Sequence, residues 1–149
     1  MVTYPDTSFL FSLYVQEQTS SFAKLFMSRR TAALPFTPFH RLELRTSLRL
    51  RAFQGLIDRA NLGWALQQSE DDLAAGIFEH APINWQRTLR EAERLAAAHL
   101  VDVGARTGDL LHVSSAVVLG ATEFLTFDQR QTALARRAGL KVRTWQNIP

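Results

Sequence analysis

The sequence contains no cysteine, which excludes disulfide bonds and thiolate metal sites and fits a reducing compartment, so we expect a cytoplasmic protein. No apolar run approaches the roughly 20 residues that a membrane-spanning helix needs. The N-terminus has neither a basic lead nor a small-residue cleavage site, so no secretory signal is expected. Internal repeats, low-complexity segments and flexible linkers are also missing. The sequence therefore predicts one domain over residues 1–149.

Lysine is scarce, because 15 of the 17 basic residues are arginine and only Lys24 and Lys141 are lysine. The formal net charge is +3. Arginine presents a planar fork of donors to phosphates and carboxylates, so this composition favours an anionic partner, either nucleic acid or an acidic protein. A GC-rich genome that favours arginine codons explains the same bias, so charge alone assigns no function.

Short apolar strands alternate with helices along the chain. The pattern predicts strands at 2–5, 34–37, 122–127 and 141–145. It predicts helices at 9–15, 20–30, 38–53, 54–61 and 85–100, one that begins directly after Thr107 as its N-cap, and one between 128 and 139. Ser69 and the acidic residues 70–72 are expected to form the first turn of a further short element. This alternation predicts an α/β fold with a parallel sheet and helices on both faces.

Two carboxylates directly follow predicted strands: Asp6 follows the first strand, and Asp128 follows "EFLTF". Ligands of open parallel sheets bind at the carboxyl ends of the strands. Asp109 lies in the first turn of a helix, where the helix dipole favours an anion. Glu43 is the one acid in "HRLELRTSLRLR". If these elements meet at one edge of the sheet, the four carboxylates converge there.

Four carboxylates in one cleft repel each other unless a cation neutralises them or some are protonated. An all-oxygen ligand set suits Mg²⁺ or Mn²⁺. Zinc is less favoured, because the sequence has no cysteine and few histidines, with His112 three residues after Asp109. A magnesium ion held by a few carboxylates keeps open positions for phosphate oxygens and can activate water. Such an ion can also stabilise the charge that develops during phosphodiester cleavage.

Each acid also has a purely structural explanation. Asp6 and Asp128 can simply cap the turns that follow their strands. Asp109 can simply complement its helix dipole. Glu43 can pair with a neighbouring arginine such as Arg45. Spacing in the sequence does not decide between these explanations and a shared metal site.

Four segments occur in the order "YPDTSFL", "HRLELRTSLRLR", "RTGDLLHVSSAVVLGATEFLTFD" and "ARRAGLKV". Together they resemble the PIN-domain nucleases, and among these the VapC toxins of bacterial toxin–antitoxin pairs. The likeness covers nearly the whole chain, and the third segment is the most specific. It implies a three-layer α/β/α sandwich with a central, mainly parallel sheet of four or five strands. It also implies cleavage of RNA by metal-activated water at a Mg²⁺ or Mn²⁺ site.

The resemblance also implies roles for individual residues. Asp6, Glu43 and Asp109 match the family's metal-binding acids, and Asp128 matches a fourth acid that acts directly or through water. Hydroxyl groups near these acids are candidates for hydrogen bonds that orient the carboxylates: Thr7, Ser8 and Thr126. Pro5 departs from the family pattern and puts the regularity of the first strand in doubt.

Arginines recur every four residues on one predicted helix face, at Arg41, Arg45 and Arg49. This stripe can guide RNA phosphates towards Glu43, form a solvated face, or bind an acidic antitoxin segment. His112 lies one turn beyond Asp109 and can contact the substrate or a metal-bound water. A packed, hydrogen-bonded histidine is the preferred explanation.

The leading hypothesis is a metal-dependent endoribonuclease that acts as a toxin and is neutralised by an antitoxin. We also expect a homodimer formed through apolar residues between 9 and 30. One alternative is a non-catalytic RNA-binding or scaffold domain. Another is a phosphatase with an aspartyl nucleophile, which normally needs a second aspartate two residues after the first. Ser8 occupies that position here, which disfavours the phosphatase.

Overall fold

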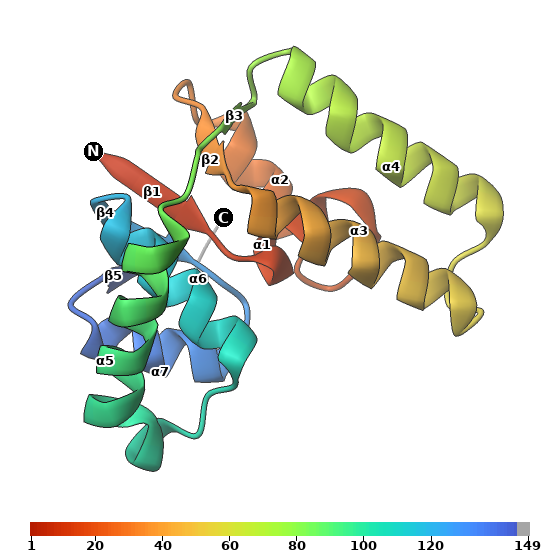
Figure 1. Cartoon of the computed structure of the whole chain (residues 1–149). Coiled ribbons are helices and arrows are strands. Elements are labelled where there is room, and N and C mark those ends of the chain that lie inside the picture. Colours follow the sequence, from red (N-terminus) through yellow and green to blue (C-terminus); the bar gives the residue numbers. More distant parts are fainter. Residues whose placement is uncertain (146–149) are drawn as a thin grey trace. The chain divides into compact units, whose positions relative to one another are not determined.

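The computed structural model describes residues 1–145, which form two compact units (Figure 1). The first unit contains Met1–Asp6 and the chain from Pro82 onward, and the second contains Thr7–Ala81. The chain therefore begins in the first unit, builds the second, and then returns to the first. Asp6 is the last residue before the chain leaves the first unit.

A three-stranded parallel sheet organises the first unit, in the order β1 (Val2–Pro5), β4 (Ala121–Leu125) and β5 (Lys141–Val142). Three helices pack with this sheet: α5 (Trp85–Val103), α6 (Thr107–Val118) and α7 (Gln129–Arg137) (Figure 1). Tyr4 and Phe124 stack with ring centroids 5.6 Å apart in the core of this unit. Leu95, Val113 and Leu134 join them from the three helices, so the helices bury one apolar core with the sheet.

The register of β1 and β4 fixes where Asp6 lies. Pro5 pairs with Leu125, and the Asp6 N–H donates to the Leu125 carbonyl at 2.9 Å, which continues the parallel ladder by one residue. Alternate residues of a parallel strand bond to the same neighbour, so the nitrogen of Pro5 faces away from β4, where no donor is needed. Pro5 therefore does not disturb the strand, and Asp6 reaches the carboxyl end of the sheet beside Thr126.

The second unit has a two-stranded parallel sheet of β2 (Leu34–Phe36) and β3 (Phe78–His80). Its helices are α1 (Thr7–Tyr14), α2 (Ser20–Ser28), α3 (Pro38–Phe53) and α4 (Arg59–Ala74). The start of α3 is well defined, because the Thr37 side chain accepts the His40 N–H at 3.1 Å and the His40 Nδ1 accepts the Thr37 N–H at 2.9 Å. Pro38 occupies the first turn, where its missing N–H costs nothing.

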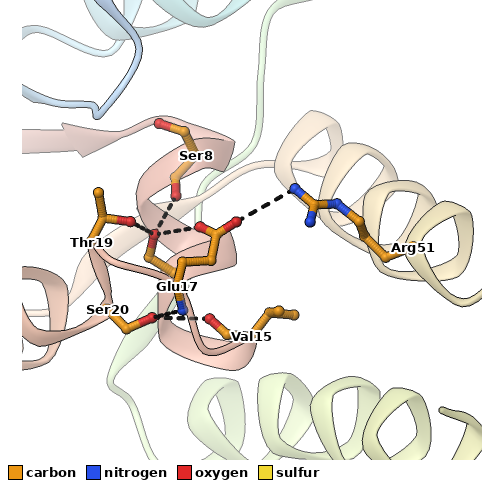
Figure 2. A network of polar contacts seen from close by, with 7 residues as sticks. Ser8, Val15, Glu17, Thr19, Ser20 and Arg51 are labelled. Atoms are coloured by element: carbon orange, nitrogen blue, oxygen red, sulfur yellow. Dashed lines mark hydrogen bonds and ion pairs between the residues drawn. The ribbon is translucent and has the colours of Figure 1, made fainter. Parts of the chain in front are cut away.

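Polar side chains fix the junction between α1 and α2 (Figure 2). The Ser20 hydroxyl accepts the Glu17 N–H at 2.9 Å and donates to the Val15 carbonyl at 3.0 Å. The Glu17 carboxylate contacts the Ser12 hydroxyl at 3.1 Å and pairs with Arg51 of α3 at 3.4 Å. The guanidinium of Arg51 also lies over the Phe11 ring. The junction between α1 and α2 is therefore bound to α3 through the ion pair of Glu17 with Arg51.

The acidic residues 70–72 were expected in the first turn of an element, and this prediction is wrong. They lie in the last turns of α4, where the helix dipole disfavours anions. Tertiary partners compensate: Glu70 pairs with Arg41 at 2.7 Å and also with Arg45, and Asp72 accepts the Tyr14 hydroxyl at 2.6 Å. Side chains from α1 and α3 therefore stabilise an acidic segment that the helix dipole alone would disfavour.

Several predicted elements have the observed bounds, among them the strand at 2–5 and the helix at 38–53. The helix predicted at 54–61 is absent, because Asp58 accepts the Asn61 N–H at 2.7 Å and starts α4 there. β3 was not predicted.

The α/β class with parallel strands is confirmed, but the five strands of residues 1–145 divide into sheets of three and two. Over those residues, no helix combines the length and hydropathy of a membrane span.

The bond between Tyr14 and Asp72 generates a prediction about stability. Burial and the nearby Asp72 carboxylate raise the pKa of Tyr14, so its hydroxyl remains a protonated donor. Asp72→Ala leaves this buried donor without its charged acceptor and should lower the free energy of unfolding by about 1.5–3 kcal/mol. Urea denaturation measures the loss.

Asp71→Ala is the matched control, because Asp71 is the exposed neighbour in the same helical turn and its side chain accepts a solvent-exposed hydrogen bond from Gln67 at 2.9 Å. It should change stability by less than about 0.5 kcal/mol. Equal stability of the two variants would contradict a stabilising role for the contact between α1 and α4.

Candidate functional site

Asp6 is a fully buried carboxylate, with 0% of its surface exposed. A carboxylate at such a position is tolerated only when polar groups or a cation replace its hydration. Its backbone is held by the ladder bond to Leu125, and its Oδ2 accepts a hydrogen bond from the Thr126 hydroxyl. The sheet therefore positions the backbone of Asp6, and Thr126 orients its side chain.

Thr126 connects two of the four predicted site acids. Its Oγ1 donates to Asp6 and accepts the backbone N–H of Asp128 at 2.9 Å. A hydroxyl has one hydrogen to donate, so accepting from Asp128 leaves that hydrogen for Asp6. Thr126 is only 2% exposed, which shields these bonds from water. The sequence predicted a contact of this kind, and its role toward a metal stays a prediction.

Asp128 caps α7. Its Oδ1 accepts the backbone N–H groups of Arg130 at 2.8 Å and Gln131 at 3.2 Å. This is the structural explanation weighed for Asp128, and it is observed. Both capping bonds use one of the two carboxylate oxygens, so capping and metal binding are compatible roles for this residue.

Asp109 lies in the first turn of α6, as expected, and is partly buried. Its Oδ2 accepts the Arg106 N–H at 2.9 Å. Arg106 is the residue that precedes the helix, whereas the sequence predicted Thr107 in that position. Asp109 therefore lies at the N-terminal end of the helix dipole, where acidic side chains are stabilising.

Glu43 belongs to the second unit and lies in the middle of α3. Leu44 and Leu48 point into the core, and the arginine stripe lies on one flank of this apolar face. At about 100° per residue, Glu43 lies about 160° around the helix axis from the middle of the stripe, on the other flank. The stripe and Glu43 therefore lie on different faces of α3, and guidance of phosphates towards Glu43 stays a prediction.

The arginines of the stripe have a partner in the same unit. Arg41 and Arg45 share the Oε1 atom of Glu70, whereas Arg49 is exposed. Partial burial, followed by the charges of Arg41 and Arg49, lowers the pKa of Arg45. Arg45, which was considered as a partner of Glu43, thus pairs with Glu70 of α4. Contact of the stripe with RNA or an antitoxin stays a prediction.

His112 is fully buried in the first unit. Its Nδ1 lies 2.9 Å from the Tyr4 hydroxyl, and the two rings meet edge to face with centroids 5.9 Å apart. This matches the packed histidine that was the preferred explanation. The contact joins β1 to α6, the elements that carry Asp6 and Asp109, whereas contact of His112 with RNA stays a prediction that its burial disfavours.

Thr7 and Ser8 begin α1 in the second unit. Thr7 is buried, and the Ser8 carbonyl accepts the Ser12 hydroxyl at 3.2 Å. Hydrogen bonds from their hydroxyl groups to the site acids stay a prediction.

The carboxyl end of the three-stranded sheet, with Asp6, Thr126 and Asp128, is called the rim below. Trp145 also contacts this rim and was not predicted as a site residue. Its indole N–H donates to the Thr126 carbonyl at 2.8 Å, and its ring lies 4.8 Å from that of Phe127. No local signal in "KVRTW" predicts the contact, because the two residues are 19 positions apart. Only the pairing of β4 with β5 brings them together.

The donor chemistry fits Mg²⁺ or Mn²⁺, because the rim offers carboxylate oxygens and a buried, oriented Asp6. Within residues 1–145, no three acidic or histidine side chains form a group that could by itself hold a metal ion. Magnesium is usually bound by one or two carboxylates, with waters and substrate phosphates completing its shell. Sharing of one ion by all four acids stays a prediction.

The bonds of Thr126 lead to a prediction that does not depend on activity. Thr126→Val keeps the shape of the side chain but removes the donor to the buried Asp6 and the acceptor for Asp128. Unfolding by urea at pH 7 should show a loss of about 1.5–3 kcal/mol, as for hydrogen bonds to charged groups. Thr126→Ser keeps the hydroxyl and should retain most of the stability; a valine variant as stable as the serine variant would argue against the bond.

A scan against family models matches the PIN domain over residues 3–137. No curated protein matches the sequence. Among solved structures, VapBC2 from Rickettsia felis bound to a DNA fragment from its promoter matches with a TM-score of 0.64 and 15% identity, over 96% of this chain and 98% of that chain. VapBC-1 from nontypeable Haemophilus influenzae matches with a TM-score of 0.64 and 15% identity, over 99% of this chain and 100% of that chain.

At this identity the solved structures establish a shared fold, and the family model spans most of the sequence. The predicted PIN-like fold is therefore confirmed, and the chain belongs to the PIN-domain family.

Proposed function

We propose that the protein is a metal-dependent endoribonuclease that hydrolyses phosphodiester bonds in RNA. One observation carries the proposal: in a chain of the PIN-domain family, a buried aspartate at the carboxyl end of a parallel sheet is oriented by a hydroxyl that also binds the next rim acid. A merely structural aspartate gains little from such burial, because desolvation of a carboxylate is costly. In this proposal the metal ion is a counter-charge of Asp6.

The metal site is assigned to Asp6, Glu43 and Asp109, with Asp128 acting directly or through a water molecule. Bound Mg²⁺ or Mn²⁺ would supply Lewis acidity and a water of lowered pKa next to the scissile phosphate. Oxygen donors of this kind match both ions.

The residues of the chain prepare this site before any substrate arrives. Thr126 holds Asp6 in one rotamer, and the cap of α7 holds Asp128. The backbone bond from Arg106 holds Asp109 at the start of α6. Oriented carboxylates need no rearrangement when charge develops on the phosphate, which is the main source of electrostatic catalysis.

The toxin role and the antitoxin partner are proposed on the likeness of the fold to the two VapBC structures. The excess of arginine suits either an acidic protein segment or RNA. We further propose that the protein acts in the cytoplasm and forms a homodimer through apolar residues between 9 and 30. A non-catalytic RNA-binding domain is the alternative that the experiments below distinguish.

Asp6→Asn and Asp109→Asn each replace a charged ligand by a neutral amide of the same size. Loss of an orienting neighbour of a metal ligand costs 10–100-fold, so loss of a ligand itself should reduce cleavage of single-stranded RNA by at least about 100-fold. Cleavage with Mg²⁺, with Mn²⁺ and with EDTA gives the rates, and circular dichroism checks the fold.

Asp102→Asn is the control for these variants, because Asp102 is an exposed aspartate on α5 that pairs with Arg137 at 3.3 Å. It should cleave at the wild-type rate. An Asp6→Asn variant that cuts as fast as wild type would refute the assigned site. Retention of RNA by a wild-type protein that never cleaves would favour the non-catalytic alternative.

Arg49→Ala tests whether the arginine stripe binds RNA. A phosphate contact should weaken RNA binding for all sequences and lower the slope of log affinity against log salt by about 1. Fluorescence anisotropy in EDTA, where cleavage is prevented, measures both quantities. Arg90→Ala removes an exposed arginine from α5 and should leave the slope unchanged; equal slopes for both variants would exclude the stripe from RNA binding.

A further inference from the structure

We propose that Trp145 is a positioning residue for the metal site, acting through the backbone of Thr126. The inference rests on the proposed function, because it concerns how well the rim acids are held for the ion. It adds a residue that lies outside the carboxylates and the hydroxyl groups considered so far. The route passes through Thr126, whose carbonyl accepts the indole N–H of Trp145 and whose hydroxyl donates to Asp6.

Trp145 follows β5 and packs against the turn between β4 and α7. Its indole N–H donates to the Thr126 carbonyl at 2.8 Å, and its ring lies 4.8 Å from the ring of Phe127. An indole N–H is a donor only, so this bond has a single direction. Trp145 therefore holds the peptide that joins Thr126 to Phe127 at two points, the Thr126 carbonyl and the Phe127 ring.

The orientation of this peptide determines where the Thr126 hydroxyl points. Threonine has a stiff χ1 angle, so its hydroxyl follows its backbone. On the side-chain side, the hydroxyl donates to Asp6 and accepts the Asp128 N–H. On the backbone side, the carbonyl accepts the bond from Trp145. Removal of the indole N–H frees the backbone carbonyl of Thr126, and the hydroxyl of the same residue orients Asp6.

The chain that leads to Trp145 is itself attached to the sheet. The Arg143 N–H donates to the Phe124 carbonyl at 3.2 Å, which extends the pairing of β5 with β4. The Arg143 side chain pairs with Glu123 at 2.7 Å, and Glu123 accepts the Thr3 hydroxyl at 3.2 Å. Contacts across all three strands of the first unit thus fix the backbone two residues before Trp145.

Trp145→Phe keeps an aromatic ring for Phe127 but removes the N–H that binds Thr126. Residues that orient metal ligands typically contribute 10–100-fold to metal affinity, so the affinity for Mn²⁺ should fall about 10-fold. Isothermal titration of the full chain with MnCl₂, without RNA, measures the affinity. Cleavage of single-stranded RNA should recover towards the wild-type rate when the Mn²⁺ concentration is raised, as expected for positioning and not for general loss of structure.

Trp64→Phe is the matched control, because it removes an indole from α4 of the second unit, where Trp64 is about half exposed. Its affinity for Mn²⁺ should equal that of wild type. An affinity of Trp145→Phe within about twofold of wild type would overturn the inference while leaving the proposed metal site intact. Failure of the wild-type protein to bind Mn²⁺ would refute the proposed function, and the inference would fall with it.

A measurement on the wild-type protein covers the case in which Trp145→Phe does not fold. The chain has three tryptophans, so its nitrogen–proton spectrum contains three indole signals, which Trp64→Phe and Trp85→Phe assign by elimination. The Trp145 signal should shift when MgCl₂ is added, and the Trp64 signal should not. A Trp145 signal that stays in place while Mg²⁺ binds would overturn the inference.

Discussion

The bond from the Thr126 hydroxyl to the Asp6 carboxylate is the interaction on which the rim depends. Burial of an ionised carboxylate is costly by several kcal/mol unless its oxygens find partners. Asp6 has no exposed surface, so water does not fill this role. The hydroxyl satisfies one oxygen and joins Asp6 to the turn that carries Asp128. Because Asp6 is also assigned to the proposed metal site, the same bond matters for stability and for chemistry.

That bond exists because the register of β1 against β4 is fixed. Pro5 lies opposite Leu125, so the next residues along each strand, Asp6 and Thr126, emerge together at the carboxyl end. A slip of one residue would turn the Thr126 side chain to the other face of the sheet and separate it from Asp6. The stacked rings of Tyr4 and Phe124 oppose such a slip, since it would expel one of them from the core.

Much of this arrangement was readable from the sequence, because it follows from local rules. An aspartate after each of two apolar strands predicts a shared edge, and both Asp6 and Asp128 are found at strand ends as expected. The contact of Trp145 with Thr126 was not readable, since it depends on the pairing of strands far apart in the chain. β3 was missed because it has three residues, two of them exposed, and so lacks an apolar pattern.

The arginines of α3 show what helix periodicity predicts and what only tertiary contacts decide. The spacing of four residues does place Arg41 and Arg45 on one flank, where both bind Glu70. Glu43 is only two residues from either arginine, yet this spacing turns it to the opposite flank. The same four-residue spacing that brings Arg41 and Arg45 to one Glu70 carboxylate thus places Glu43 on a separate face of the helix.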